Sequence, residues 1–272
     1  NAAYSHRCQV IGPMLRLPCV NGGIALGIGL DDQFTRWEPL LHPGDIVYLP
    51  MEFAQYTVSH AANRLGPDAA ILLRHNRIIL ARLPPGRWLG AFFAADLRAL
   101  VLSAVEMAVH TAGLAGPRRA LAGKFDAAGD RIGATAAKAR RNQAFLATLD
   151  RADPTAAQID SGYGSIEIIR FLHWATAHHV HAIGGLPTEF AAIRLPAETL
   201  AATGALYRRN HAGFLMLPGE SRYPHRDFYD SPDHLVQGCQ IAHSIAVARA
   251  LAKLLRRAIR PPPAWVKKHH CR

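Results

Sequence analysis

The second half of the sequence alternates helix-like and strand-like segments. Residues 166–177 and 196–208 have the apolar spacing of helices, whereas 180–187 and 213–218 are short apolar runs that contain glycine and end in proline. A helix and the strand after it occupy roughly thirty residues, the size of a βαβ unit. This alternation predicts an α/β fold, in which helices cover both faces of a parallel sheet.

One more strand is expected in the first half. The run Ile46–Leu49 is short and rich in β-branched residues, and it follows a Pro-Gly-Asp turn. It therefore fits a buried parallel strand. Glu52 comes just after this run, so it lies at the carboxyl end of a strand. It is either a surface carboxylate or part of a site.

The stretch Asp227–Leu235 follows the last predicted strand and contains an acid and a histidine close together, Asp230 and His234. Ligands of open α/β sheets bind outside the carboxyl ends of the strands. A histidine held there by a carboxylate can act as a general base, because the acid fixes its tautomer and stabilises the imidazolium. The alternative is a capped helix start that carries a surface histidine.

A long helix is predicted after this stretch. Ser231 is a good N-cap and Pro232 a good first helical residue, which would place His234 in the first turn. The apolar residues on one side of this helix are Ile241, Ile245, Ala248, Leu251, Leu255 and Ile259. The end of the chain, residues 261–272, begins with three prolines and is expected to be a disordered basic tail.

The net charge of +11 raises the possibility of an acidic partner. The basic residues are mostly scattered, with local concentrations at 256–260 and 267–268. They form no basic stripe with interleaved aromatic residues, so specific binding of nucleic acid is not predicted.

Metal and disulfide chemistry are not indicated by the spacing of cysteines and histidines. Loop 124–133 offers too few oxygen ligands for calcium. His178, His179 and His181 straddle a helix-to-strand junction, where a solvated cluster is expected. We expect no metal and no cofactor. The cysteines form no CxxC pair, which predicts neither a disulfide framework nor a zinc module and leaves the redox compartment open. They are Cys8, Cys19, Cys239 and Cys271.

No run reaches the roughly 18 uninterrupted apolar residues that a membrane span needs. Residues 67–116 are apolar with scattered charges and are expected to form a helical insertion. The chain begins with Asn1 and shows no signal peptide, so we expect a fragment whose targeting segment lies upstream.

Four segments resemble the SGNH/GDSL hydrolase superfamily, and most closely its bacterial branch found near exopolysaccharide and cell-envelope genes. They are the Asn-Gly-Gly turn of Val20–Gly23, the Gly-Asp strand segment Gly44–Phe53, the Gly-Asp loop Asp126–Asp130 and the acid–histidine block Asp227–Leu235. They occur in the expected order over nearly the whole chain, and the last is the most specific. The resemblance implies a three-layer α/β/α, flavodoxin-like parallel sheet in a single domain over residues 1–260.

The resemblance also implies a serine esterase or O-acyltransferase that acts on acyl esters of a cell-envelope polysaccharide or exopolysaccharide. His234 would be the general base and Asp230 would orient it, while the oxyanion and substrate would meet Asn1, Gly23 and Glu52. The serine of the family's Gly-x-Ser block is expected just upstream of Asn1, so the fragment alone is expected to be inactive. An acylated carbohydrate is the expected substrate, in the periplasm or cell envelope, with a membrane anchor possible in the upstream part.

Several positions depart from the family's pattern. Ser5 is the only nearby hydroxyl candidate, but no glycine precedes it in the family's manner. The usual Asp-x-x-His spacing falls on Ser231, which leaves Asp230 and Asp233 as alternative partners of the histidine. Ala54 lies near the place of the family's oxyanion asparagine. These departures favour an alternative function, a non-catalytic carbohydrate-binding or scaffold protein in an envelope complex.

Overall fold

The computed structural model of this chain describes residues 4–23, 29–60, 125–149, 154–268 and 271, together with single positions between 85 and 112. Asn1 and almost all of the expected insertion over 67–116 lie outside the described residues.

The elements are as follows in chain order. The first part contains α1 (Cys8–Leu15), α2 (Leu30–Trp37), the 3₁₀-helix η3 (Glu38–Leu40), β1 (Ile46–Pro50) and α3 (Phe53–Thr57). The middle part contains α9 (Ala136–Ala139), η4 (Arg140–Asn142), α10 (Gln143–Leu146), α11 (Ala156–Ser161) and α12 (Tyr163–Ala177). The last part contains β2 (His181–Gly185), β3 (Glu189–Phe190), α13 (Ala197–Arg209), β4 (Gly213–Leu215), β5 (Arg222–Tyr223), η5 (His225–Asp227), α14 (Gln237–Leu254) and η6 (Ala264–Lys268).

Three parallel strands form the central sheet in the order β1-β2-β4. Ile46 lies opposite His181 and Pro50 opposite Gly185, while Ile183 lies opposite Gly213. Strands β3 and β5 form a separate parallel pair. The strands predicted from the apolar runs, and their parallel direction, are confirmed.

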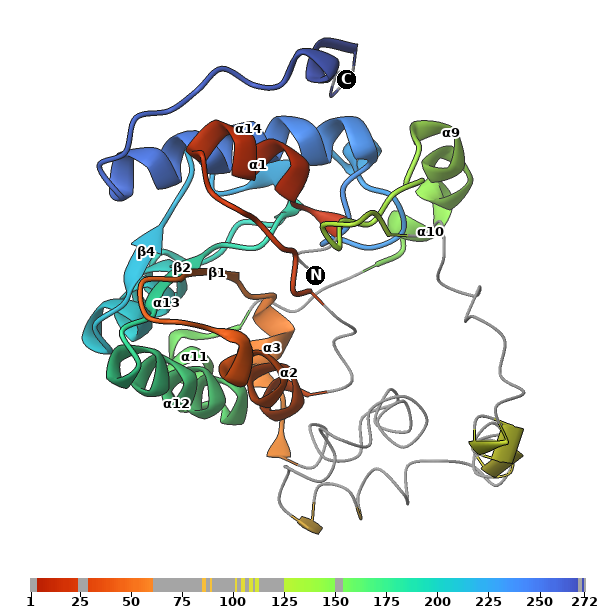
Figure 1. Cartoon of the computed structure of the whole chain (residues 1–272). Helices are drawn as coiled ribbons and strands as arrows, with labels where there is room; N and C mark the ends of the chain where they lie inside the picture. The colour runs from red at the N-terminus through yellow and green to blue at the C-terminus, as the bar shows by residue number, and fades with distance from the viewer. Residues whose placement is uncertain are drawn as a thin grey trace.

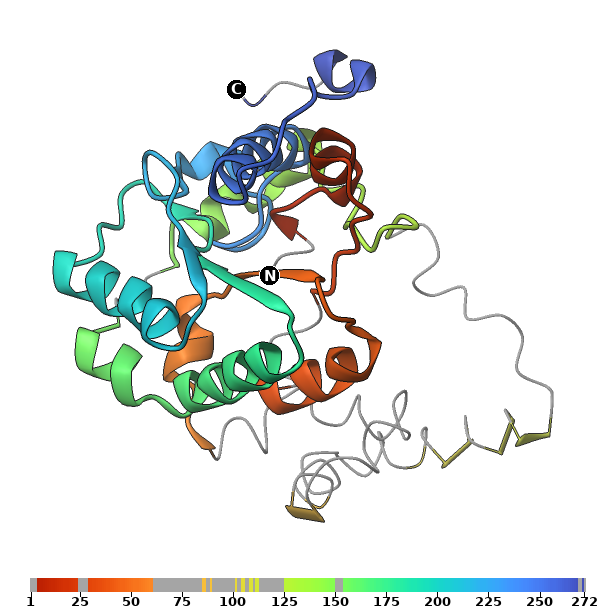
Figure 2. The same cartoon turned by 60° about the vertical axis from the view of Figure 1, so that its left-hand side comes forward.

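Alternate residues of the strands pack into two apolar clusters. Val47 and Leu49 join a cluster that includes residues of α12 and α13, whereas Ile46 and Tyr48 join a cluster built with α1 and α14. Both views show α1 and α14 on one side of the sheet and α12 on the other (Figures 1 and 2). The chain thus has an α/β fold with a small parallel sheet and helices on both faces.

The helix after the acid–histidine block begins later than predicted. Its first residue is Gln237, and Val236 is its N-cap. The N–H of Tyr229 donates to the carbonyl of His234, and Phe228 and Leu235 form an isolated antiparallel bridge. These contacts close residues 228–235 into a loop before the helix begins. His234 therefore lies in this loop and not in a first helical turn.

The same helix also ends earlier than predicted. It stops at Leu254, and Arg256 has φ 51°, a left-handed conformation that does not continue a helix. Ile259 lies beyond this end. Residues 136–146 form three short helices in succession, α9, η4 and α10.

All four cysteines are paired, in Cys8–Cys19 and Cys239–Cys271, so the prediction of no disulfides is wrong. Spacing rules miss the second pair because its partners are 32 residues apart and meet only after the chain has passed along α14. The prediction of a disordered tail is also wrong for the described residues up to 268 and for 271. In this part of the chain η6 forms, Val266 is buried, and Cys271 is joined to Cys239 by a disulfide bond.

The backbone of the glycine turn packs closely against an aromatic ring at Gly22, where a Cβ atom would lie 2.9 Å from the Trp37 ring. Within the described residues, no helix has the length and apolar character needed to cross a bilayer.

Candidate functional site

Asp230 and His234 form a hydrogen-bonded pair in the loop between η5 and α14. Nδ1 of His234 lies 2.7 Å from Oδ1 of Asp230, and the two side chains are 19% and 40% exposed. An ionised carboxylate can only accept hydrogen bonds, so Nδ1 is the donor. When the imidazole is neutral, its lone pair is therefore on Nε2. Nε2 has no hydrogen-bond partner among the described residues. Asp230, and not Asp233, is thus the partner of this histidine.

The loop is held rigidly at both ends. Phe228 and Leu235 are fully buried and face each other as an isolated bridge. Between them, the N–H of His234 donates to the carbonyl of Ser231 at 3.2 Å, and the N–H of Asp233 donates to Oγ of Ser231 at the same distance. The sequence folds this way because two apolar anchors flank a polar run that satisfies its own backbone.

The start of the described chain lies against the imidazole. The ring of Tyr4 stacks on His234 with centroids 3.9 Å apart, and the carbonyl of Tyr4 accepts the N–H of Leu235. The guanidinium of Arg131 lies 5.4 Å from the centre of the Tyr4 ring. Burial raises the pKa of the Tyr4 hydroxyl, and the nearby Arg131 opposes that rise.

Ser5 follows Tyr4 and is almost fully buried. Its Oγ lies 2.5 Å from the carbonyl oxygen of Asp233 and 2.8 Å from Oγ1 of Thr188. No hydrogen bond joins it to His234 in this structure. Ser5 thus contacts Asp233, the residue next to the imidazole, as Ser231 of the loop also does, but the Ser5 hydroxyl donates to a carbonyl and makes no hydrogen bond to the base.

The turn that carries Ser5 is fixed by the groups around the start of α1. The carboxylate of Asp130 accepts hydrogen bonds from the N–H of Gln9 at 3.3 Å and from the side-chain amide of Asn21 at 3.1 Å. It also accepts a hydrogen bond from the N–H of Cys8. It caps the positive end of this helix. Burial is the main cause that raises the pKa of the Asp130 carboxyl. The N–H of Arg7 donates to Oγ of Ser244 in α14 at 2.7 Å.

Two buried histidines extend this arrangement into the core. Nε2 of His6 lies 3.2 Å from Nε2 of His243, and Nδ1 of His243 lies 2.8 Å from the Tyr223 hydroxyl. Burial lowers the pKa of His243 to about 3, so the ring is neutral at physiological pH. One of the two Nε2 atoms then carries the shared proton. The sequence analysis did not predict these residues as part of the site. His243 lies among the apolar residues of α14, and that position is the signal that could have identified it.

The other predicted site residues have different roles here. Glu52 is buried, so the surface interpretation is wrong. It is the N-cap of α3: its backbone carbonyl accepts the N–H of Gln55 at 2.8 Å, and its own N–H donates to Oε1 of Gln55 at 3.0 Å. The N–H of Gly23 donates to Oδ1 of Asn21 at 3.1 Å and is therefore engaged. Asn1 lies outside the described residues.

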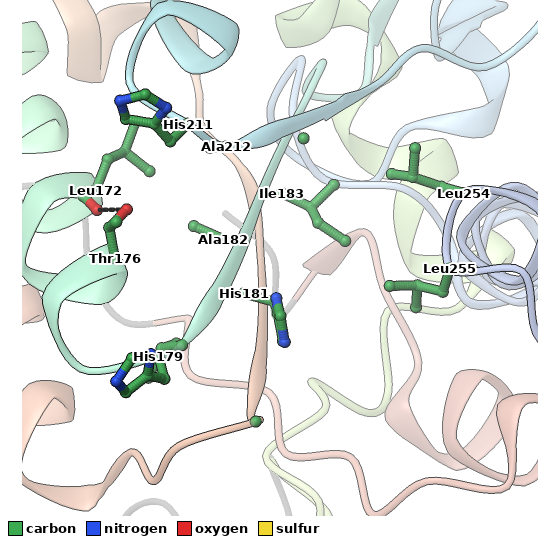
Figure 3. Close-up of a pocket in the computed structure, with 13 residues that line it drawn as sticks. Leu172, Thr176, His179, His181, Ala182, Ile183, His211, Ala212, Leu254 and Leu255 are labelled. Atoms are coloured by element: carbon green, nitrogen blue, oxygen red, sulfur yellow. Dashed lines mark hydrogen bonds between the residues drawn. The ribbon is translucent and has the colours of Figure 1, made fainter.

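A cavity of about 580 Å³ lies at the opposite, amino end of the strands. Gly44, His181 and Gly213 line it near the starts of the three strands, and Figure 3 shows His179 and His211 at different sides of it. The dyad is at the carboxyl end, so this cavity is not its substrate site.

These histidines also form no metal cluster in the part of the chain that the structure describes. There, potential metal ligands gather at Asp227, Cys239 and Cys271, and the two sulfurs already form a disulfide.

No protein-family model, curated protein or solved structure matches this chain. Its function must therefore be argued from its own residues.

Proposed function

We propose that this chain is a serine esterase or O-acyltransferase that acts on acyl esters of a cell-envelope polysaccharide or exopolysaccharide. The observation that supports this function best is the 2.7 Å pair of Asp230 and His234, next to the start of the chain. The three-layer flavodoxin-like arrangement of the SGNH superfamily is part of the same proposal.

In this reaction Nε2 of His234 takes the proton of a serine hydroxyl as its oxygen attacks the ester carbonyl. The tetrahedral intermediate expels the sugar oxygen, which receives that proton from the imidazolium, and an acyl-serine remains. Water or an acceptor hydroxyl then attacks the acyl-serine by the same route in reverse, so the enzyme returns to its first state. Asp230 keeps the ring in the required tautomer and stabilises its charged form.

The nucleophile is a serine at the start of the chain. The resemblance places it upstream of Asn1, whereas Ser5 is a described serine near the start of the chain whose hydroxyl contacts Asp233, next to the dyad histidine. Ser5 needs a side-chain rotation away from the Asp233 carbonyl to reach the imidazole. Gly23 would donate its N–H to the oxyanion after releasing Asn21, and such a donor is worth about 10²–10³ in rate.

An envelope location agrees with the pairing of all four cysteines. Disulfides form and persist in oxidising compartments such as the bacterial periplasm. A membrane anchor upstream of Asn1 remains part of this proposal.

A second candidate function is a non-catalytic carbohydrate-binding or scaffold protein of an envelope complex. One observation favours it: the Ser5 hydroxyl is bound to a backbone carbonyl and to Thr188 and makes no hydrogen bond to the base. A binding protein needs no free nucleophile.

Labelling with a fluorophosphonate probe distinguishes the two functions. The full-length protein is treated with the probe, and the modified serine is located by peptide mass spectrometry, alongside hydrolysis of p-nitrophenyl acetate. We expect one labelled serine, and the loss of both label and turnover in His234→Ala. The exposed His42 pairs with Asp45 at 3.8 Å elsewhere, so His42→Ala is the matched control and should retain both. Absence of labelling in the unsubstituted protein would favour the binding function.

A further inference from the structure

The last part of the chain carries most of the net charge. From His234 to the end the sequence contains no aspartate or glutamate and eight basic residues: Arg249, Lys253, Arg256, Arg257, Arg260, Lys267, Lys268 and Arg272. The net charge of the whole chain is +11, so +8 comes from these last residues and +3 from all that precede them. The rest of the molecule is close to electrically balanced.

Six of these eight basic residues lie between residues 253 and 268, a piece of chain that we call the C-terminal segment. Its exposed basic residues are Lys253, Arg256, Arg257 and Arg260. Three large apolar side chains are exposed among them, Leu254 at 45%, Ile259 at 42% and Trp265 at 39%. Isolated exposed apolar residues are ordinary on a protein surface, but here they alternate with cations along one continuous stretch.

The C-terminal segment is held in place on the outside of the fold. Both views show the chain after α14 crossing the outer side of that helix, away from the sheet (Figures 1 and 2). The N–H of Arg260 donates to the carbonyl of Met14, Val266 is buried, and Cys271 is linked to Cys239 at the start of α14. The segment is therefore a prearranged surface, which lowers the entropy cost of binding.

We propose that the C-terminal segment docks this protein on an anionic lipid surface. Lysine and arginine are attracted to negatively charged headgroups, and tryptophan and aliphatic side chains are stabilised at the boundary between headgroups and acyl chains. An acidic polysaccharide or a nucleic acid would satisfy the cations equally well. It would offer Leu254 and Ile259 no apolar environment, so the combination of exposed groups favours lipid.

Co-sedimentation with lipid vesicles tests this. The full-length protein, or this chain if the full-length protein carries a separate anchor, is mixed with vesicles of phosphatidylcholine alone or with about 30% phosphatidylglycerol. We expect binding only to the anionic vesicles, and weaker binding at 0.5 M than at 0.1 M salt because the salt screens the charges. The double variant Arg256→Glu, Arg257→Glu should reduce the partition coefficient about tenfold or more.

The matched control reverses the same number of charges elsewhere. Arg140 and Arg141 are exposed on η4, so the variant Arg140→Glu, Arg141→Glu has the same net charge and should retain binding. Brominated lipid should quench the fluorescence of Trp265, and Trp265→Phe should remove that quenching.

Three results would overturn the proposal. They are equal loss of binding in both double variants, absence of binding to anionic vesicles, and retention on DNA or an anionic polysaccharide without any binding to vesicles. None of these results depends on whether the protein is an esterase.

Discussion

At the scale of single residues, replacing Asp230 by the isosteric asparagine tests how much its negative charge contributes to catalysis. We expect Asp230→Asn to lower kcat for p-nitrophenyl acetate by about 10²–10⁴, with little change in KM. The amide cannot stabilise an imidazolium, and its NH₂ group can favour the wrong tautomer of His234. Asp230 is 40% exposed, so thermal stability should change little. An unchanged kcat in a protein that labels with fluorophosphonate would remove Asp230 from the mechanism.

His243 should make stability depend on pH in a defined direction. Burial lowers its pKa from 6.5 to about 3. The unfolded chain therefore binds a proton at this residue below about pH 6.5, whereas the folded chain does so only near pH 3. The free energy of unfolding is thus highest above pH 6.5 and falls as the pH decreases towards 3, by roughly 3 kcal/mol at pH 4.5.

Urea unfolding at pH 7 and pH 4.5 measures this decrease in the free energy of unfolding. Other groups also titrate in this range, so the comparison is with His243→Gln, which keeps polar atoms near His6 and Tyr223 but does not ionise. The loss of stability between the two pH values should be about 3 kcal/mol smaller in the variant. Equal losses in both proteins would show that the imidazole does not carry the effect.

At the scale of elements, the two disulfides should differ in their contribution. Removing a disulfide restores freedom to the unfolded chain, and the effect grows with the length of the closed loop. The sequence separations are 11 residues for Cys8–Cys19 and 32 for Cys239–Cys271. Replacing each pair by serine should destabilise the protein by about 3 and 4 kcal/mol, respectively. Denaturant unfolding of the two variants checks the order, which would be reversed if local strain and not loop length dominated.

The contact between α12 and α3 reverses the usual preference for alanine over glycine in a helix. A Cβ atom at Gly164 would lie 1.6 Å from the carbonyl oxygen of Gln55, a backbone atom that cannot move easily. Gly164→Ala should therefore destabilise the protein by about 1–3 kcal/mol or more. Gly204 in α13 is the control, because there the obstacle at 2.8 Å is only the end of the flexible Arg208 side chain. Thermal melts should show Gly204→Ala close to neutral.

The strands were predictable and the site was only partly so, for physical reasons. A parallel strand covered by helices on both faces, such as β1, is apolar along its length, so its sequence alone identifies it. The start of α14 depends instead on whether the backbone near His234 closes a loop or continues a helix, and Phe228 decides this through its contact with Leu235. The disulfide of Cys239 likewise depends on the path of the chain after α14, which brings Cys271 back to the start of that helix. Interactions far apart in sequence leave no local pattern.

At the scale of the whole molecule, histidines gather at both ends of the sheet, but only those at the carboxyl end are expected to matter for catalysis. His179, His181 and His211 line the cavity at the amino end (Figure 3). We expect the variant with all three replaced by alanine to hydrolyse p-nitrophenyl acetate within about twofold of the unsubstituted rate, because ligands of α/β sheets bind beyond the carboxyl ends of the strands. The zinc content by mass spectrometry should be the same in both proteins. A large fall in turnover, or loss of stoichiometric zinc, would move the functional site to the opposite end of the sheet and would remove the basis for assigning catalysis to His234.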